Sequence, residues 1–230
     1  MNELFAASAT IGVAISLIAY QIGMYLKNKT KFALFNPLMI SIILVIAFLL
    51  VFDIDYANYN KSGHYLSYLL TPATVSLAIP LYEKIALLKK HYVAILIGVL
   101  SGVLTSLLSI LGMSALFQLS HSEYVTMLPK SITTAIGIGI SEELGGYTSI
   151  TAAVIIMTGI LGNVIGEITC KLFRIKHPIS KGLAFGTSSH AIGTSKALEL
   201  GEIEGAMSSL AIVVAGLITV IGASIFAGIY

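Results

Sequence analysis

The sequence predicts an all-α polytopic membrane protein with about seven spanning segments, a re-entrant hairpin and an inverted repeat containing two interrupted helices. Three observations support this fold class. Of the 230 residues, 57% are hydrophobic and only 10% are charged, whereas a soluble domain carries about 25% charged residues. Long uncharged segments recur along the chain, and a helix needs roughly 20 such residues to cross the hydrocarbon core. Most of the basic residues are confined to three short loops.

The uncharged segments define the expected helices in order. The first begins at Ile11 and is broken only by small residues, Tyr20 and Gln21. The preceding stretch, MNELFAASAT, lacks the basic region of a signal peptide, so we expect the first helix to be retained. The expected segments are 11–26, 32–52, 63–82, 91–117, 147–170, 177–201 and 205–230.

The distribution of charge predicts the path of the chain through the membrane. Lysines and one arginine cluster in the loops 27–31, 84–91 and 171–181, and the positive-inside rule places all three loops in the cytoplasm. This assignment puts the N-terminus outside and the C-terminus in the cytoplasm. Because residues 128–146 must then begin and end outside, we expect a re-entrant hairpin or a non-spanning helix there.

Two of the expected segments are poor membrane helices. LLTPATVSLAIPLYE (69–83) contains two prolines, and FGTSSHAIGTSKALE (185–199) contains Gly186 and Gly193. Each lies between two longer apolar segments, and the two triplets cross in opposite directions, as in an inverted-repeat transporter with its binding site at the interruptions. The alternative is that prolines and glycines merely kink two ordinary helices. The expected organisation is one transmembrane domain, 1–230, with repeat 1 at 31–117 and repeat 2 at 146–230.

The interruptions have a predicted chemistry. Backbone released from a helix inside a membrane survives only within protein or beside water, and Gly186 and Gly193 permit the required turns. New half-helices are expected to start near residues 194–196 and 71–72, where their N-termini favour an anion. Lys196 adds a full positive charge, so a small carboxylate is the expected ligand. The expected substrate-binding residues are Thr71, Pro72, Thr74, Thr187, Ser188, Ser189, His190, Gly193, Thr194 and Lys196.

Several of these residues have alternative interpretations. His190 either positions substrate or a proton, or is a hydrogen-bonded structural histidine. No second ligand lies at metal spacing on its segment, so neither a metal nor another cofactor is expected. The Ser-Ser-His run lacks a G-x-S-x-G elbow and a third member, so the protein is not expected to be an enzyme. Lys196 is either an anion ligand or the partner of Glu199 in a helical pair.

Other conspicuous residues lie outside the interruptions. Glu142 either lines an outer vestibule or is solvated together with Glu143. Glu167 either takes part in coupling transport to an ion or faces water at the cytoplasmic boundary. Two glycine pairs, 98/102 and 162/166, are interpreted as helix-packing faces, and Cys170 as a packed residue. The candidates for a coupling or vestibule role are Thr133, Thr134, Glu142 and Glu167.

Four stretches together resemble the CidB/LrgB family, in the family's order and over residues 31–230. They are LTPATVSLAIPLYEK, MLPKSITTAIGIGISEELGG, MTGILGNVIGE and RIKHPISKGLAFGTSSHAIGTSKALELGEIEGAMSSLAIVVAG. The H-A-I-G-T-x-K-A-L-E-L-G run with the upstream K-G-L-A-x-G-T is highly specific. The chain departs from the family at Ala135, where proline is usual, at Gly139, where an acidic residue is frequent, and at Glu167, where a non-acidic residue is usual.

The resemblance implies two classes of function. Some members of the family are holin- or antiholin-like and affect murein hydrolase activity and lysis. Others carry small monocarboxylates, among them a plastidial glycolate/glycerate translocator and bacterial pyruvate carriers. The resemblance also implies a bacterial inner (cell) membrane, a small LrgA/CidA-type membrane partner and a homo- or hetero-oligomer. No nucleic-acid partner is expected, and the carrier function is the main prediction.

Overall fold

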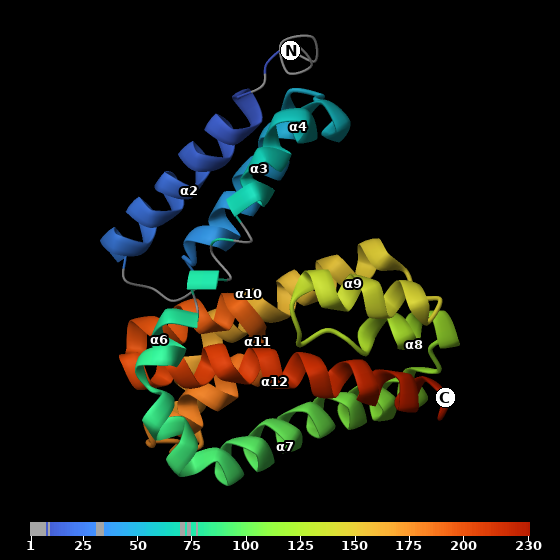
Figure 1. Cartoon of the computed structure of the whole chain (residues 1–230). Coiled ribbons are helices and arrows are strands. Elements are labelled where there is room, and N and C mark those ends of the chain that lie inside the picture. The colour runs from blue at the N-terminus through green and yellow to red at the C-terminus, as the bar shows by residue number, and fades with distance from the viewer. Residues whose placement is uncertain (1–7, 9, 31–34, 70–71, 73–74, 77) are drawn as a thin grey trace. The chain divides into compact units, whose positions relative to one another are not determined.

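The computed structural model describes residues 8, 10–30, 35–69, 72, 75–76 and 78–230, and the regular structure within these residues is entirely helical (Figure 1). The chain forms two compact units, Met1–Ser76 and Leu77–Tyr230. We call them unit 1 and unit 2. The expected single domain and the boundaries of its repeats remain predictions.

Unit 1 is built around a helical pair, α2 (Ile11–Thr30) and α3 (Pro37–Val51). The helix α3 begins where it does because the Asn36 side chain accepts hydrogen bonds from two backbone N–H groups and proline occupies the first helical position. A short helix, α4 (Tyr56–Gly63), and the 3₁₀ segment η1 (His64–Leu69) follow. The Ser62 hydroxyl accepts a hydrogen bond from the Gly12 N–H at 2.8 Å, which fixes α4 against the start of α2.

Unit 2 contains three helices that are long and apolar enough to cross a membrane. They are α7 (Ile85–Phe117), α10 (Thr148–Leu172) and α12 (Glu202–Ala227). The apolar part of α7 follows a kink at His91, in agreement with the predicted segment 91–117. The short helix α6 (Ala78–Glu83) precedes α7 and packs against α12. The prediction of an all-helical membrane protein is confirmed at this level.

Helices α7 and α12 lie side by side and run in the same direction (Figure 1). Near their N-terminal ends Lys84 forms an ion pair with Glu202 at 2.8 Å. Near their C-terminal ends the Tyr230 hydroxyl donates to the Ser114 carbonyl oxygen at 3.1 Å. The predicted path, which has these two segments crossing in opposite directions, is therefore wrong. The predicted inverted repeat, in which 91–117 and 205–230 are counterparts, also requires these two segments to run in opposite directions.

Residues 118–147 form a hairpin, which we call the first hairpin. Its arms are α8 (His121–Met127) and α9 (Thr134–Glu143). A capping box between Ser120 and Glu123 starts α8. Gly145, with φ of +78°, follows the end of α9 and prevents the helix from continuing. The Tyr147 N–H donates to the Thr126 hydroxyl at 2.8 Å, which joins the end of the hairpin to the last turn of α8. The start and the end of 128–146 therefore lie close together, as expected, and the re-entry of this segment into the membrane remains a prediction.

The helix α11 (Pro178–Leu200) is broken at His190, whose φ is +42° and ψ is −139°. The break reverses the chain. A side-chain carbon at Gly193 would lie 2.9 Å from the carbonyl oxygen of Phe185, although residues eight apart in a straight helix are separated by about 12 Å. We call the two arms, 178–189 and 191–200, the second hairpin. Its open end lies at the C-terminal end of α10 and the N-terminal end of α12.

The second hairpin confirms one prediction and corrects three. The expected interruption within 185–199 exists, but it lies at His190, so the second arm begins before the predicted residues 194–196. Gly186 and Gly193 do not form turns, because both lie within helical arms. The segment 177–201 does not cross from one side to the other, since both of its ends lie together. In the other predicted interruption, residues 70, 71, 73, 74 and 77 lie outside the described residues.

Glycines allow the arms of the second hairpin to approach their neighbours closely. Side-chain carbons at Gly98 and Gly102 of α7 would meet Leu183 and Thr187 at 3.0 and 2.9 Å. The same construction at Gly162 and Gly166 of α10 would clash with Ser189 and Phe185. Both predicted glycine pairs are therefore packing faces, as expected, and both of them contact the first arm of the second hairpin.

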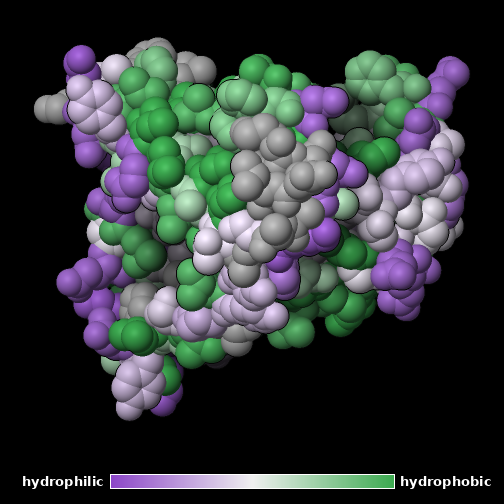
Figure 2. Space-filling view, turned by 90° about the horizontal axis from the view of Figure 1, so that it is seen from above, coloured by the Kyte–Doolittle hydropathy of each residue, from purple (hydrophilic) through white to green (hydrophobic). Residues whose placement is uncertain are grey.

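Large apolar side chains are exposed along the long helices. Figure 2 shows exposed apolar side chains, interspersed with polar ones, on one face of the molecule. Leu100, Leu108 and Leu116 of α7 are examples. Soluble monomers rarely expose apolar patches of this extent. This surface suits a lipid environment.

Candidate functional site

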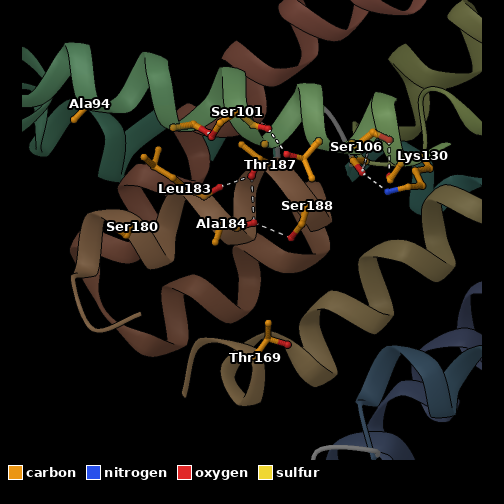
Figure 3. A pocket seen from close by; sticks show the side chains of 15 residues that line it. Ala94, Ser101, Ser106, Lys130, Thr169, Ser180, Leu183, Ala184, Thr187 and Ser188 are labelled. Carbon is orange, nitrogen blue, oxygen red and sulfur yellow. Dashed lines mark hydrogen bonds between the residues drawn. The ribbon is translucent and has the colours of Figure 1, made fainter. Parts of the chain in front are cut away.

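A cavity of unit 2 with a volume of about 600 Å³ lies between α7, the first arm of the second hairpin and the tip of the first hairpin. Figure 3 shows side chains from these elements converging on it. Small and hydroxyl-bearing residues dominate its lining, which is unusual for a space between apolar helices. The lining residues used below are Ser101, Thr105, Ser106, Ser109, Lys130, Ser131, Thr187 and Ser188.

One wall of the cavity is a hydroxyl-bearing face of α7. Ser101, Thr105 and Ser109 are four residues apart, so they lie on one side of the helix, and all three are exposed in the isolated chain. Their hydroxyls donate to backbone carbonyls within α7, with Ser101 bonding to Gly98 and Thr105 to Ser101 at 2.8 and 2.7 Å. The hydroxyl oxygens remain able to accept hydrogen bonds from a ligand or from water.

Of the residues in the described part of the chain that line this cavity, only Lys130, at the tip of the first hairpin, is charged. Its ammonium donates to the Ser131 hydroxyl at 3.0 Å, and Ser131 lies 3.1 Å from the Ser106 hydroxyl of α7 (Figure 3). Among the described residues, no carboxylate lies within ion-pair distance of Lys130.

A second cavity, of about 390 Å³, lies on the other side of the second hairpin, against α10. It shares Lys130 and Ser188 with the first cavity and is otherwise mostly apolar. Both hairpin tips therefore border the same region. Lys130 is the charged group common to the two spaces.

The break of the second hairpin is held by hydrogen bonds. The buried His190 ring places Nε2 2.9 Å from the Ile155 carbonyl oxygen of α10, so Nε2–H donates to it. The Thr194 hydroxyl lies 2.9 Å from the His190 carbonyl oxygen and 2.7 Å from the Ser208 hydroxyl of α12. The tip is thus bonded to two long helices. In this arrangement His190 has the structural role that the sequence left open as an alternative, and its ring does not line either cavity.

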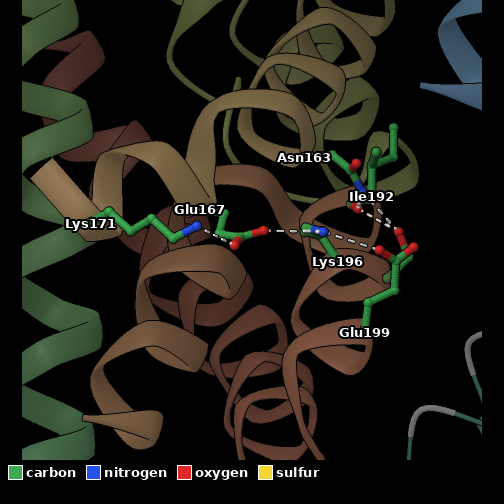
Figure 4. Close-up of polar contacts among 7 residues, drawn as sticks. Asn163, Glu167, Lys171, Ile192, Lys196 and Glu199 are labelled. Carbon is green, nitrogen blue, oxygen red and sulfur yellow. Dashed lines mark hydrogen bonds and ion pairs between the residues drawn. The ribbon is translucent and has the colours of Figure 1, made fainter. Parts of the chain in front are cut away.

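Lys196 belongs to an ion-pair network on the far side of the second hairpin (Figure 4). Its ammonium lies 3.1 Å from Glu199 and 3.4 Å from Glu167 of α10. Glu167 also pairs with Lys171 at 2.8 Å. Within the described part of the chain these contacts join two cations and two carboxylates. The pair with Glu199 is the alternative predicted for Lys196, and its anion-binding role remains a prediction.

The predicted site residues are only partly brought together. Thr187 and Ser188 line the first cavity, and Ser188 and Ser189 line the second. Gly193 and Thr194 are buried in the packing of the hairpin. Thr133 and Thr134 lie where α9 begins, next to the first hairpin's tip, while Glu142 and Glu143 are exposed at its far end. Thr71 and Thr74 lie outside the described residues, and Pro72 belongs to unit 1.

Two features of the site were missed from the sequence. Lys130 follows a proline in a segment that was considered mainly for its threonines and glutamates. The hydroxyl face of α7 was overlooked, although serines and threonines four residues apart in an apolar segment are a readable signal. Among the residues that the structure describes, no three His, Cys, Asp or Glu side chains gather into a metal site.

Comparison with known proteins places the chain in a family. The model of the LrgB-like family matches residues 16–229. The antiholin-like protein LrgB of Bacillus subtilis (strain 168) is 40% identical over 220 residues, covering 95% of each chain. Its namesake from Bacillus cereus (strain B4264) is 40% identical over 211 residues, covering 91% of this chain and 92% of the relative. No solved structure matches. The chain, with its two hairpins between long apolar helices, belongs to the LrgB-like family.

Proposed function

We propose that this protein is a secondary carrier of small monocarboxylates of the 2-oxo and 2-hydroxy acid class. The observation that supports the proposal most directly is the approach of two hairpins, from opposite ends of unit 2, to one hydroxyl-lined cavity. A carrier needs a substrate site near the middle of the membrane that each side can reach in turn. A protein that only forms lesions needs an amphipathic wall and no such site.

The order of elements in unit 2 is consistent with this proposal. Helix α7 is followed by the first hairpin, which returns to the end where α7 finishes. Helix α10 runs the opposite way, and the second hairpin returns to the end where α10 finishes. We propose these two pairs as the inverted repeat, in place of 31–117 and 146–230. Non-helical backbone at membrane depth is tolerated because each hairpin is enclosed by long helices.

The names of the relatives favour a second candidate function. They are called antiholin-like, which fits a protein that modulates murein hydrolase activity or lysis better than it fits a carrier. This candidate needs no transported substrate. Partnership with a small LrgA/CidA-type membrane protein, expected from the resemblance, belongs to the same proposal.

Uptake into proteoliposomes separates the two candidates. The purified protein is reconstituted in vesicles that contain a trapped fluorescent dye, and labelled pyruvate and glycolate are supplied with and without a proton gradient. A carrier gives saturable uptake without release of the dye. Release of the dye, or uptake that does not saturate, contradicts the carrier proposal, and uptake that depends on the gradient identifies proton coupling.

A further inference from the structure

We propose that Lys130 binds the charged end of the transported anion, and that the cavity around it selects anions with a single negative charge. The inference rests on the proposed carrier function, and it assigns the binding role to a residue on the first hairpin rather than to Lys196. Three observations lead to it: the unused hydrogen-bonding capacity of Lys130, the hydroxyls around it and the charge balance of the cavity.

The ammonium group of Lys130 has capacity to spare. A lysine carries three N–H donors, and one of them is directed to the Ser131 hydroxyl at 3.0 Å. No carboxylate among the described residues lies within ion-pair distance, although Lys84, Lys171 and Lys196 each have one. A half-buried charge without a counter-charge is costly. An anion in the adjoining cavity removes that cost.

Hydroxyl groups surround the ammonium on the side of the cavity. Ser131 and Ser106 are linked at 3.1 Å, and Thr187 and Ser188 face the same cavity from the second hairpin. Figure 3 shows Lys130 and Ser106 at one end of the cavity and the hydroxyls of Thr187 and Ser188 further along it. A carboxylate bound by Lys130 would leave its other oxygen atoms, such as a 2-oxo or 2-hydroxy group, within a row of hydroxyl partners.

The charge of the cavity argues for a monoanion. Lys130 is the one charged residue among the described residues that line either cavity. A monocarboxylate therefore completes a neutral pair, whereas a dicarboxylate leaves one negative charge buried without compensation. Lys196 does not alter this balance, because Glu167 and Glu199 already pair with it.

The test measures anion binding to the full-length protein in lipid nanodiscs by calorimetry, with pyruvate and succinate as probes. For wild type we expect pyruvate to bind at least tenfold more tightly than succinate. Lys130→Met should weaken pyruvate binding ten- to a hundred-fold, and Lys130→Arg should recover part of it. Lys89→Met, at an exposed lysine of α7 that lines neither cavity, is the matched control and should bind as wild type does.

A second variant tests the charge rule without removing Lys130. Ser109→Lys adds a cation at an exposed position of the same cavity wall, and it should raise the affinity for succinate relative to pyruvate about tenfold. Unchanged pyruvate binding in Lys130→Met, or a loss seen only in Lys196→Gln, overturns the inference while leaving the carrier function intact. If wild type binds neither probe, the carrier function itself is refuted, and this site with it.

Discussion

His190 shows how much a single residue contributes to this fold. Its φ of +42° is a conformation in which L-residues are strained, at a cost of about 1–3 kcal/mol. A glycine would adopt it without that cost, yet the chain has histidine there. The ring explains the choice, because it donates to the Ile155 carbonyl oxygen and anchors the reversal of the chain on α10.

This role predicts an order of stability among variants at position 190. His190→Ala keeps the strained backbone and removes the hydrogen bond to the Ile155 carbonyl oxygen, which should destabilise the protein by about 0.5–1.5 kcal/mol. His190→Gly loses the same hydrogen bond but relieves the backbone strain, so its free energy of unfolding should fall by about 1 kcal/mol less than that of His190→Ala. Thermal unfolding in detergent measures both variants. Equal stability of the two would show that the backbone at 190 is not strained.

At the residue scale, chemistry was easier to predict than geometry. The sequence identified Thr187 and Ser188 as polar residues in an apolar segment, and both line a cavity. It could not show that Lys196 faces Glu167, because that carboxylate is contributed by a different helix. Nor could it show that Lys130 has no carboxylate partner in the described part of the chain, since that property depends on everything that folds around it.

Among the elements, α7 offers a matched test of helix packing. Gly102→Ala places a methyl group 2.9 Å from the Thr187 hydroxyl oxygen, and such overpacking costs about 1–3 kcal/mol. Gly112→Ala, on the same helix, meets nothing within 4 Å and should be neutral or slightly stabilising. Thermal unfolding compares the two variants. A destabilised Gly112→Ala would mean that the loss comes from α7 itself and not from its contact with the second hairpin.

The ion pair between α10 and the second arm of the second hairpin predicts a modest coupling. Because the Glu167 side chain is 37% exposed, the pair with Lys196 should contribute only about 0.2–1 kcal/mol. The double-mutant cycle of Glu167→Gln and Lys196→Gln measures this coupling from unfolding in detergent. A coupling energy of zero would indicate that Glu199 alone compensates the charge of Lys196 and that Lys171 alone compensates the charge of Glu167.

Helix boundaries followed well from the apolar periodicity and from end signals, whereas the path of the second hairpin did not. Proline at the start of α11 and glycine after its end mark the limits that the sequence predicted. Within those limits, a kink and a complete reversal require similar glycine- and hydroxyl-rich sequences. Contacts with α7, α10 and α12 decide between them, and those contacts lie far apart along the chain.

For the molecule as a whole, the parallel direction of α7 and α12 predicts which positions share a side of the membrane. In a Cys170→Ser background, cysteines placed at Leu119 and Gly228 should be labelled from one side, and cysteines at Lys84 and Glu202 from the other. An impermeant maleimide applied to intact cells and to inverted vesicles makes the measurement. Labelling of positions 228 and 84 from the same side would contradict the parallel arrangement. The positive-inside rule, applied to loop 84–91, predicts that position 84 is cytoplasmic.

The architecture of the whole molecule was predictable as a class and not as a topology. Composition and the long uncharged segments were enough to predict a helical membrane protein, because few other structures satisfy the backbone in lipid. The predicted pairing of 69–83 with 185–199 remains a prediction, because residues 70, 71, 73, 74 and 77 lie outside the described residues. The approach of the first hairpin to the second was not predicted, because the sequence of the first hairpin resembles an ordinary loop with two short helices.

The partnership of α7 with α12 also has a consequence for how the protein is made. Helix α12 follows α7 and the first hairpin along the chain, so a ribosome releases these two elements before the helix that packs against them. Until α12 is made, the faces that it covers in the folded protein remain uncovered by it. Chains that end before α12 therefore expose these faces, which favours misassembly.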